Sequence, residues 1–291
     1  ADDPPLMLAM EEQGEVAIRV ARSGQVSFFN ARDGKAVLQQ QLPIPAGAQV
    51  TSFNVETPNS RRFVVGLSNG QVLIAQHDYK VTYPDDVRLI TPSLNFPYGQ
   101  EAITLDEQGR ALDQVAMSSD SNGLTLAGSI GSDLVATSVS IKRNMMTGAE
   151  TRSESRLALD PAQGEVTRIL IDPLRQWMYV VNGEQHIDVL ALRKKGELNG
   201  RYKVVEGMGT SITSVNLMLG GISLIVGDSS GELKQWFMVR GNGHPLLTEV
   251  RDFDQQQGES IALIQPEERR KVFLAVDTAG QLGIYNSTAH N

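Results

Sequence analysis

The feature that most constrains the fold of this chain is a short pattern that recurs along its length. In each copy, an apolar run leads into a turn that contains glycine, and a second apolar run with alternating character follows. The turn glycines are Gly24, Gly70, Gly131, Gly183, Gly231 and Gly280, so successive copies are 46, 61, 52, 48 and 49 residues apart. Blades of WD40 and kelch propellers recur at roughly 40–50 residues. The spacing therefore predicts an all-β, WD40-like β-propeller with six blade-like repeats.

The segments around each turn supply the strands that a four-stranded blade needs. The hairpins cover residues 16–29, 62–74, 124–139, 177–190, 222–237 and 272–285. Apolar segments upstream of the hairpins predict the innermost strands, at 50–55, 112–117, 166–171, 212–217 and 261–264. More polar segments at 36–42 and 201–205 predict outer strands, which are polar because they form an edge.

The physical basis of this arrangement is mutual burial of small sheets. Continuous apolar runs such as Phe63-Val64-Val65 are typical of strands covered on both faces. One thin sheet cannot cover both of its own faces, whereas sheets stacked around an axis cover one another. A pair of β-sandwiches is the alternative architecture, and it explains the strands but not the regular interval. Helical periodicity is not sustained anywhere.

We expect residues 1–291 to form a single propeller domain with an insertion at about 84–110. This segment is rich in proline and glycine and accounts for the long interval before Gly131. A recognition loop and a structural decoration are both compatible with it. Residues 6–10 either begin blade one or complete blade six, so we expect the sequence to stop short of the natural closure of the ring.

Composition narrows the possible partners. The net charge is −8 and the pI about 5.1, which argues against a nucleic-acid partner and against adsorption to anionic lipid. The chain has no cysteine, which excludes disulfides, thiolate zinc sites and cysteine nucleophiles. No apolar stretch reaches the length of a membrane span. The N-terminus, residues 1–5, has no basic region followed by an apolar one, so no signal peptide is visible. The first residue is alanine, so we expect a processed or excised chain.

No catalytic, cofactor-binding or metal-binding residues are predicted. Residues 227–231, Gly-Asp-Ser-Ser-Gly, match the G-x-S-x-G nucleophile elbow, but that motif needs a following helix and the repeat predicts a strand. The four histidines, His77, His186, His244 and His290, are far apart in sequence, and the carboxylate pairs Asp85-Asp86 and Glu267-Glu268 have no special context. We interpret all of these as structural or surface residues.

The remaining conspicuous residues are also expected to be structural. We expect exposed turns at Arg61-Arg62, at Arg193-Lys194-Lys195 and at residues 267–271. Trp177 and Trp236 occupy apolar strand positions and are expected to pack between strands. The sequon at Asn286 matters only in a eukaryotic secretory context, which no feature of the sequence supports.

Several segments have sequences that are more specific than the general blade pattern. They are residues 77–85 (His-Asp-Tyr-Lys-Val-Thr-Tyr-Pro-Asp), 198–203, 220–228, 235–240 and 287–290. Together they resemble the large insertion in the long-form inner-membrane permease of bacterial phosphate ABC transporters. The resemblance spans nearly the whole chain, although none of these segments is a catalytic motif.

The resemblance implies a periplasmic location, at the face of the bacterial inner membrane, and a parent permease with seven blades. The transport helices of that family are not in this sequence, so contact with the membrane would come only through the parent's helices. No phosphate-binding residue is carried over. We therefore expect a non-catalytic platform for transporter subunits or the phosphate-binding protein. The alternative is a propeller enzyme or small-ligand binder that uses the central channel.

Overall fold

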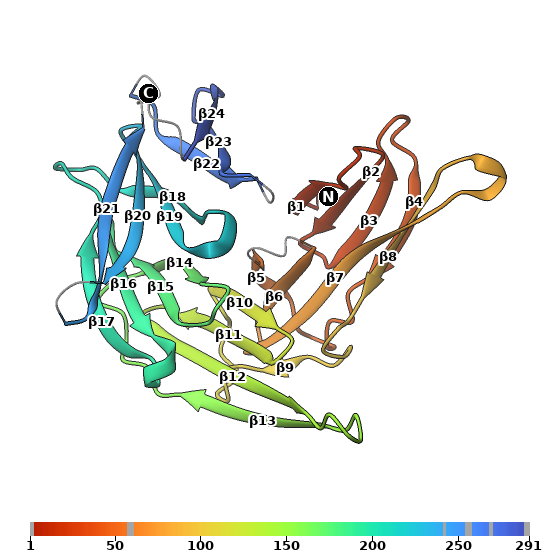
Figure 1. The fold of residues 1–291 in the computed structure, drawn as a ribbon, viewed down its shortest axis with the longest axis horizontal. Helices are drawn as coiled ribbons and strands as arrows, with labels where there is room; N and C mark the ends of the chain where they lie inside the picture. Colours follow the sequence, from red (N-terminus) through yellow and green to blue (C-terminus); the bar gives the residue numbers. More distant parts are fainter. Residues whose placement is uncertain (1–2, 57–60, 241–242, 254–257, 268–269, 288–291) are drawn as a thin grey trace. The chain divides into compact units, whose positions relative to one another are not determined.

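The computed structural model describes residues 3–56, 61–240, 243–253, 258–267 and 270–287. In these residues the regular structure consists of 24 β-strands and three short 3₁₀ helices. The strands form six sheets that follow one another along the chain, and these sheets are the blades of a β-propeller (Figure 1). The predicted fold class is confirmed. None of the helices in the described residues has the length and apolar character of a membrane span.

The chain divides into two compact units, and the first comprises residues 1–55 and 61–115. It holds the first two blades, each made of four strands in sequence order, with the short strand β9 added to blade two beside β7. Buried side chains from both blades form one core, centred on Phe28 and Phe63. The strands are β1 (Pro5–Met10), β2 (Val16–Ala21), β3 (Gln25–Asn30), β4 (Ala36–Gln41), β5 (Val50–Val55), β6 (Arg62–Leu67), β7 (Gln71–Thr82), β8 (Leu89–Asn95) and β9 (Ile103–Thr104).

The second unit comprises residues 56–60 and 116–291 and holds blades three to six. Blades three to five have four strands, and blade six has three in the described residues. The strands are β10 (Gln114–Asp120), β11 (Gly123–Ile130), β12 (Asp133–Arg143), β13 (Glu150–Leu157), β14 (Val166–Ile171), β15 (Trp177–Asn182), β16 (His186–Ala191), β17 (Glu197–Lys203), β18 (Ile212–Leu217), β19 (Ser223–Asp228), β20 (Leu233–Arg240), β21 (Pro245–Phe253), β22 (Ile261–Pro266), β23 (Val272–Asp277) and β24 (Leu282–Asn286).

Neighbouring blades of the second unit bury one another's faces. One core joins blades three and four around Ile169 and Met178. A second joins blades four and five around Ile187 and Leu224, and a third joins blades five and six around Ile225 and Phe273. The odd-numbered and even-numbered residues of a strand therefore pack into different cores, because successive side chains of a strand point to opposite faces of the sheet. This mutual covering is the arrangement that the continuous apolar runs predict.

Most predicted strands are present at or near the expected residues. The first strands of blades two, four and five have the predicted bounds, whereas β10 begins two residues and ends three residues later than predicted. The outer strand β17 begins at Glu197, four residues before its predicted start. Residues 6–10 lie in β1, which pairs with β2 and so begins blade one.

A β-bulge recurs near the start of the first strand of five blades. Pairing with the second strand shifts register after the first residue of each strand, between Pro5 and Met7, Val50 and Ser52, Val166 and Arg168, Ile212 and Ser214, and Ile261 and Leu263. Such a bulge adds one residue to one strand and increases the local twist. These blades therefore share a backbone irregularity as well as a strand order.

Blades two and five also share a set of small polar contacts. The first strands carry the same pattern, Thr-Ser-x-Asn, at 51–54 and 213–216. In blade five, the Ile264 N–H donates to Ser214 Oγ at 3.1 Å, and Asn216 Nδ2 donates to Ile264 O at 3.2 Å. In blade two, Ser52 Oγ donates to Leu112 O at 2.8 Å and Asn54 Nδ2 donates to Val115 O at 2.9 Å. The polar groups thus tie a first strand to the backbone of the following segment.

A glycine lies opposite the serine in each of these pairs of strands. Gly66 pairs with Ser52, and Gly227 pairs with Ser214. A Cβ atom at Gly66 would lie 2.7 Å from Val115 Cγ1, and one at Gly227 would lie 2.7 Å from Ile261 Cγ2. Both glycines therefore allow close approach of the next segment of chain, a role distinct from turn formation.

Residues 84–110, which were expected to form an insertion, contain a regular blade strand. The segment includes β8, the fourth strand of blade two, and the added strand β9. The long interval before Gly131 arises largely from the extended β7–β8 hairpin, whose paired residues run from Gln76 with Asn95 to Thr82 with Leu89. Sequence spacing alone does not distinguish a lengthened hairpin from an inserted loop.

The tip of this hairpin has an unusual turn. The Val87 N–H donates to Pro84 O at 2.9 Å, and both central residues have positive φ, 50° at Asp85 and 60° at Asp86. These dihedral angles correspond to a type I′ turn, in which the second central position favours glycine. We expect Asp86→Gly to raise the free energy of unfolding by about 1 kcal/mol, because a side chain costs energy in the left-handed region.

Urea denaturation of the parent protein and the variant would measure this change. The matched control is Asp33→Gly, at an exposed turn aspartate whose φ is not positive and whose side chain accepts a hydrogen bond from the Lys35 N–H. We expect the control to be unchanged or less stable. An equal gain in both variants would show that the strain at Asp86 is not the cause.

Candidate functional site

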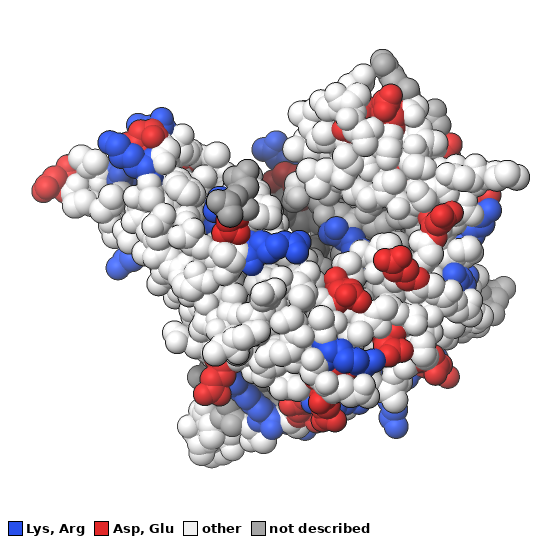
Figure 2. Space-filling view, turned by 180° about the vertical axis from the view of Figure 1, so that it is seen from behind, with Lys and Arg blue, Asp and Glu red and all other residues white. Residues whose placement is uncertain are grey.

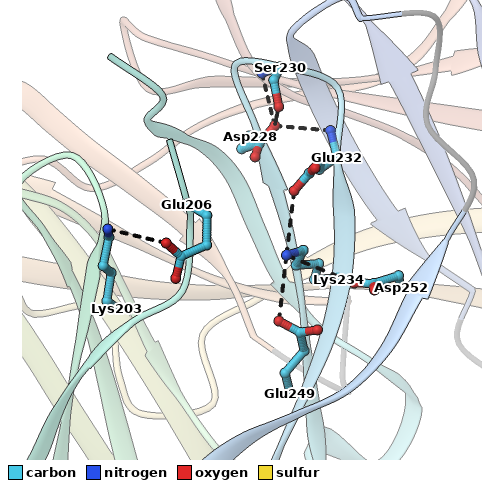
Figure 3. Close-up of polar contacts among 8 residues, drawn as sticks. All are labelled: Lys203, Glu206, Asp228, Ser230, Glu232, Lys234, Glu249 and Asp252. Atoms are coloured by element: carbon cyan, nitrogen blue, oxygen red, sulfur yellow. Dashed lines mark hydrogen bonds and ion pairs between the residues drawn. The ribbon is translucent and has the colours of Figure 1, made fainter. Parts of the chain in front are cut away.

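A charged network on the outer strands of blade five is the best-defined surface feature of the second unit. Lys234 on β20 contacts three carboxylates: its Nζ lies 3.5 Å from Glu232, 3.6 Å from Glu249 and 4.0 Å from Asp252 (Figure 3). We call these four residues the Lys234 cluster. The lysine side chain is 18% exposed, whereas those of the acids are 35%, 38% and 68% exposed. The acids therefore face solvent around a covered cation.

Strand register explains how these residues meet. Lys234 pairs directly with Asp252, and Glu232 lies two residues earlier on the chain. The register of β21 shifts between the partners of Gln235 and Trp236, which are Arg251 and Glu249. Because this bulge adds a residue, Glu249 and Asp252 reach the same lysine although they are three residues apart.

The electrostatics of the Lys234 cluster favour a permanent positive charge at its centre. Burial by itself lowers the pKa of Lys234, but Glu249, Glu232 and Asp252 outweigh this effect and raise the pKa above its usual value. Three carboxylates around one cation leave an excess of negative charge. A second pair, Lys203 and Glu206 at 3.3 Å, lies in the same view (Figure 3). On the face drawn in Figure 2, acidic and basic residues are interspersed.

The Gly-Asp-Ser-Ser-Gly segment at 227–231 ends strand β19 and forms the hairpin turn that precedes Glu232. Asp228 Oδ1 accepts hydrogen bonds from the Ser230 N–H, the Ser230 hydroxyl and the Glu232 N–H, at 2.8–2.9 Å. Ser229 Oγ accepts a hydrogen bond from the Ser211 N–H at 3.0 Å. The segment that follows is strand β20, as the repeat predicts. It lacks the helix that a nucleophile elbow requires.

The described histidines lie in different surroundings. His77 is buried on β7 with its ring 5.6 Å from that of Tyr79. His186 begins β16, where burial and the nearby Arg201 lower its pKa. His244 lies in the loop before β21, and His290 lies outside the described residues. Within the described residues, no group of three His, Asp or Glu side chains is placed to hold a metal ion.

Of the three charged segments that were expected to be exposed turns, two are exposed and one is not. Arg193, Lys194 and Lys195 are exposed as predicted, and so are the described residues Glu267, Arg270 and Lys271. The prediction for Arg61-Arg62 is wrong, because both residues are only half-exposed and engaged. Arg61 forms an ion pair with Glu12 at 3.1 Å, and Arg62 begins β6 with its guanidinium over the Tyr98 ring.

The expected roles of the two tryptophans are confirmed. Trp236 is buried in the core between blades four and five, and Trp177 packs against the same core. Both belong to strands whose apolar runs the repeat identifies, β20 and β15. Their rings therefore contribute to inter-blade packing.

A buried polar cluster lies within blade four. Asn182 on β15 donates a hydrogen bond to Asp188 on β16, and Arg201 on β17 lies 3.8 Å from the same carboxylate. Burial raises the pKa of Asp188, although Asn182 and Arg201 favour its charged form. Residues of three adjacent strands thus share one buried carboxylate.

Sequence analysis missed Arg168, a charged residue on the first strand of blade four. It lies in an apolar segment, Val-Thr-Arg-Ile-Leu-Ile, which was assigned only as a strand. Its Nε is buried without a hydrogen-bond partner. The signal was present in the sequence, since Arg168 is the charged residue of an otherwise uncharged innermost strand.

Comparison with solved structures agrees with this architecture. The chain is similar to the Dos1 propeller (12% identity, TM-score 0.58, 96% of this chain and 67% of that one). It is also similar to hydrazine synthase of Kuenenia stuttgartiensis (12%, 0.57, 98% and 78%) and to the computationally designed Ika8 protein (14%, 0.53, 98% and 72%). No family model and no curated protein matches the chain. At these identities the likeness defines a class, the β-propellers, through the fold alone.

Proposed function

We propose that the chain is a non-catalytic, extracytoplasmic propeller domain of a phosphate ABC transporter permease. In this role it faces the periplasm at the bacterial inner membrane and serves as a protein-interaction or regulatory platform in phosphate import. Its partner is the phosphate-binding protein or another transporter subunit. Membrane attachment comes from helices of the parent permease.

The placement of the segments that resemble the permease carries this proposal. Residues 198–203 lie in the outer strand β17, and residues 235–240 lie in β20 beside the outer strand β21. Asn199 Nδ2 donates to Pro245 O at 2.8 Å and so connects β17 with β21. Residues 198–203 and 237–240 are exposed or partly exposed, so interior packing imposes few demands on them, whereas Gln235 and Trp236 are buried. A resemblance in these strands therefore supports a shared surface role as well as a shared fold.

The Lys234 cluster lies on or beside β20 and β21 and gives their exposed surface an excess of negative charge. Its excess of carboxylates suits a partner surface that is rich in lysine and arginine. Complementary charges at an interface accelerate association and select the correct partner. The acidic outer edge of blade five is therefore the surface that we assign to partner binding.

The test measures binding of the cognate phosphate-binding protein to this chain by calorimetry, with and without phosphate and at two salt concentrations. We expect the double variant Glu249→Lys, Asp252→Lys to weaken binding by about tenfold or more. The matched control is Asp33→Lys, which reverses an exposed charge in the first unit. Circular dichroism and thermal melting confirm that each variant is folded.

Two outcomes would count against the proposal in different ways. Failure of the parent chain to bind at high micromolar concentration, in either phosphate condition, would exclude this partner. Equal binding by the parent chain and the double variant would keep the partner but exclude the Lys234 cluster as the contact surface.

A further inference from the structure

Two adjacent methionines, Met145 and Met146, lie at the tip of the hairpin between β12 and β13 in blade three. Their side chains are 99% and 96% exposed. Methionine is one of the residue types that folded proteins most often bury completely. Single apolar side chains are common on protein surfaces, whereas two neighbours with almost complete exposure form a distinct surface feature.

Strand register places this tip outside the four-stranded sheet. The last residue of β12 that pairs with β11 is Ser140, whereas pairing between β12 and β13 continues to Arg143 and Glu150. The hairpin therefore extends past the end of β11, as the ribbon of blade three shows (Figure 1). This extension accounts for the exposure of the two thioether groups.

The backbone of the tip is held by hydrogen bonds that do not involve the methionine side chains. Asn144 Oδ1 accepts hydrogen bonds from the Met146 N–H at 2.9 Å and from the Thr147 N–H at 3.1 Å. The Asn144 N–H donates to Ala149 O, and the Gly148 N–H donates to Asn144 O, both at 2.8 Å. The thioether groups can therefore change chemically without loss of the contacts that form the turn.

Other methionines of the described residues provide an internal comparison. Met178 is fully buried in the core between blades three and four, and Met218 is 3% exposed in the core between blades five and six. Met7 and Met117 are also buried. Met208, in the loop between β17 and β18, is fully exposed. A dissolved reagent should therefore reach Met208 and the hairpin tip far more readily than the four buried methionines.

The chemistry available at the tip is oxidation of sulfur. The chain contains no cysteine, so methionine thioethers are its only sulfur groups. When a thioether meets hydrogen peroxide, a sulfur lone pair attacks one oxygen, the O–O bond breaks, and the departing hydroxide takes the remaining proton to form water. The sulfur loses two electrons to become a sulfoxide, and the peroxide is reduced. The product is polar, whereas the thioether is apolar.

We propose that Met145 and Met146 form a site of oxidative modification, at which a reagent of the peroxide class converts both thioethers to sulfoxides while blade three stays folded. The modification changes the projecting tip from an apolar to a polar surface. Exposure of the side chains and the independence of the turn from them carry the proposal. It goes beyond the transporter proposal and does not depend on it.

The test treats the full chain with hydrogen peroxide and follows each methionine by peptide mapping and mass spectrometry. Cleavage by trypsin after Arg143 and Arg152 releases residues 144–152, in which Met145 and Met146 are the only methionines. We expect both to react at a rate within about threefold of that of free methionine. Met178, in the tryptic peptide 176–193, should react at least about tenfold more slowly, because it must first be exposed by opening of the core.

The matched control is the double variant Met145→Leu, Met146→Leu, which keeps the apolar surface but removes both sulfur atoms. Its peptide 144–152 should gain no oxygen, whereas Met208 should react as in the parent chain. Limited oxidation should leave the Tm of the parent chain equal to that of the double variant treated in the same way. Oxidation of Met178 as fast as that of Met145, or a lower Tm in the oxidised parent chain than in the treated double variant, would overturn the proposal.

Discussion

Replacing Gly227 with valine should destabilise the second unit by about 3 kcal/mol, because the new side chain enters a closely packed junction between blades. A Cβ atom at this position would lie 2.7 Å from Cγ2 and 2.8 Å from Cβ of Ile261, on the first strand of blade six. Ile261 is fully buried and its strand is held to blade five through Ser214 and Asn216. Neither partner can therefore move aside without breaking other contacts. Urea denaturation followed by circular dichroism measures the loss.

Two companion variants separate crowding from a general effect of larger residues. Gly227→Ala adds the single carbon that makes the contact, so it should lose a smaller but measurable part of the stability. Ala262→Val adds carbons at an exposed position on the adjacent strand β22 and should stay within about 0.5 kcal/mol of the parent protein. A value for Gly227→Val as small as that of Ala262→Val would contradict the close approach of the two blades.

Replacing Asp172 with alanine should cost about 3 kcal/mol, because one buried carboxylate organises the turn between β14 and β15. Its Oδ1 accepts hydrogen bonds from the Gln176 and Trp177 N–H groups at 2.7 and 2.6 Å, and its Oδ2 accepts one from the Leu174 N–H at 3.1 Å. Leaving such donors without partners costs roughly 1–3 kcal/mol for each buried group. Thermal and urea denaturation would measure the change.

The destabilisation by Asp172→Ala should also depend on pH in a defined direction. Burial raises the pKa of Asp172, although the three N–H groups act in the opposite sense. Folding therefore disfavours ionisation, and the contribution of Asp172 to stability falls as pH rises from the ordinary aspartate pKa through the raised one. The difference between parent and variant should be larger near pH 4 than near pH 7. A difference that grows with pH would show that the folded pKa is lowered.

Glycine-marked repeats predicted the blades well because local chemistry controls them. Turn residues and apolar runs are properties of neighbouring residues, so β5, β14 and β18 were predicted with their observed bounds. The third blade was less accurate, since β10 begins inside a segment of mixed polarity at Gln114. Residues 84–110 were interpreted as an insertion because spacing reveals extra length but not whether a strand pair has been extended.

The site residues were harder to predict for a different reason. The Lys234 cluster depends on a bulge in β21 that brings Glu249 and Asp252 to one lysine, and no local pattern predicts that register shift. Arg61 was expected to be exposed because two adjacent arginines usually are, yet its partner Glu12 is 49 residues away in sequence. Contacts between distant segments decide such cases.

The shared bulge and the matching Ser, Asn and Gly residues of blades two and five have a consequence for how such a chain can grow. Two sheets that begin with the same β-bulge and present the same small residues to the next segment form the same kind of contact with it. A duplicated hairpin therefore already carries the residues that it needs to pack against its neighbour, and duplication requires no further substitution at that contact. The turns and the third and fourth strands are left free to diverge. In the described residues the third strands differ most in length, from five residues in β24 to twelve in β7, whereas every first strand has six or seven.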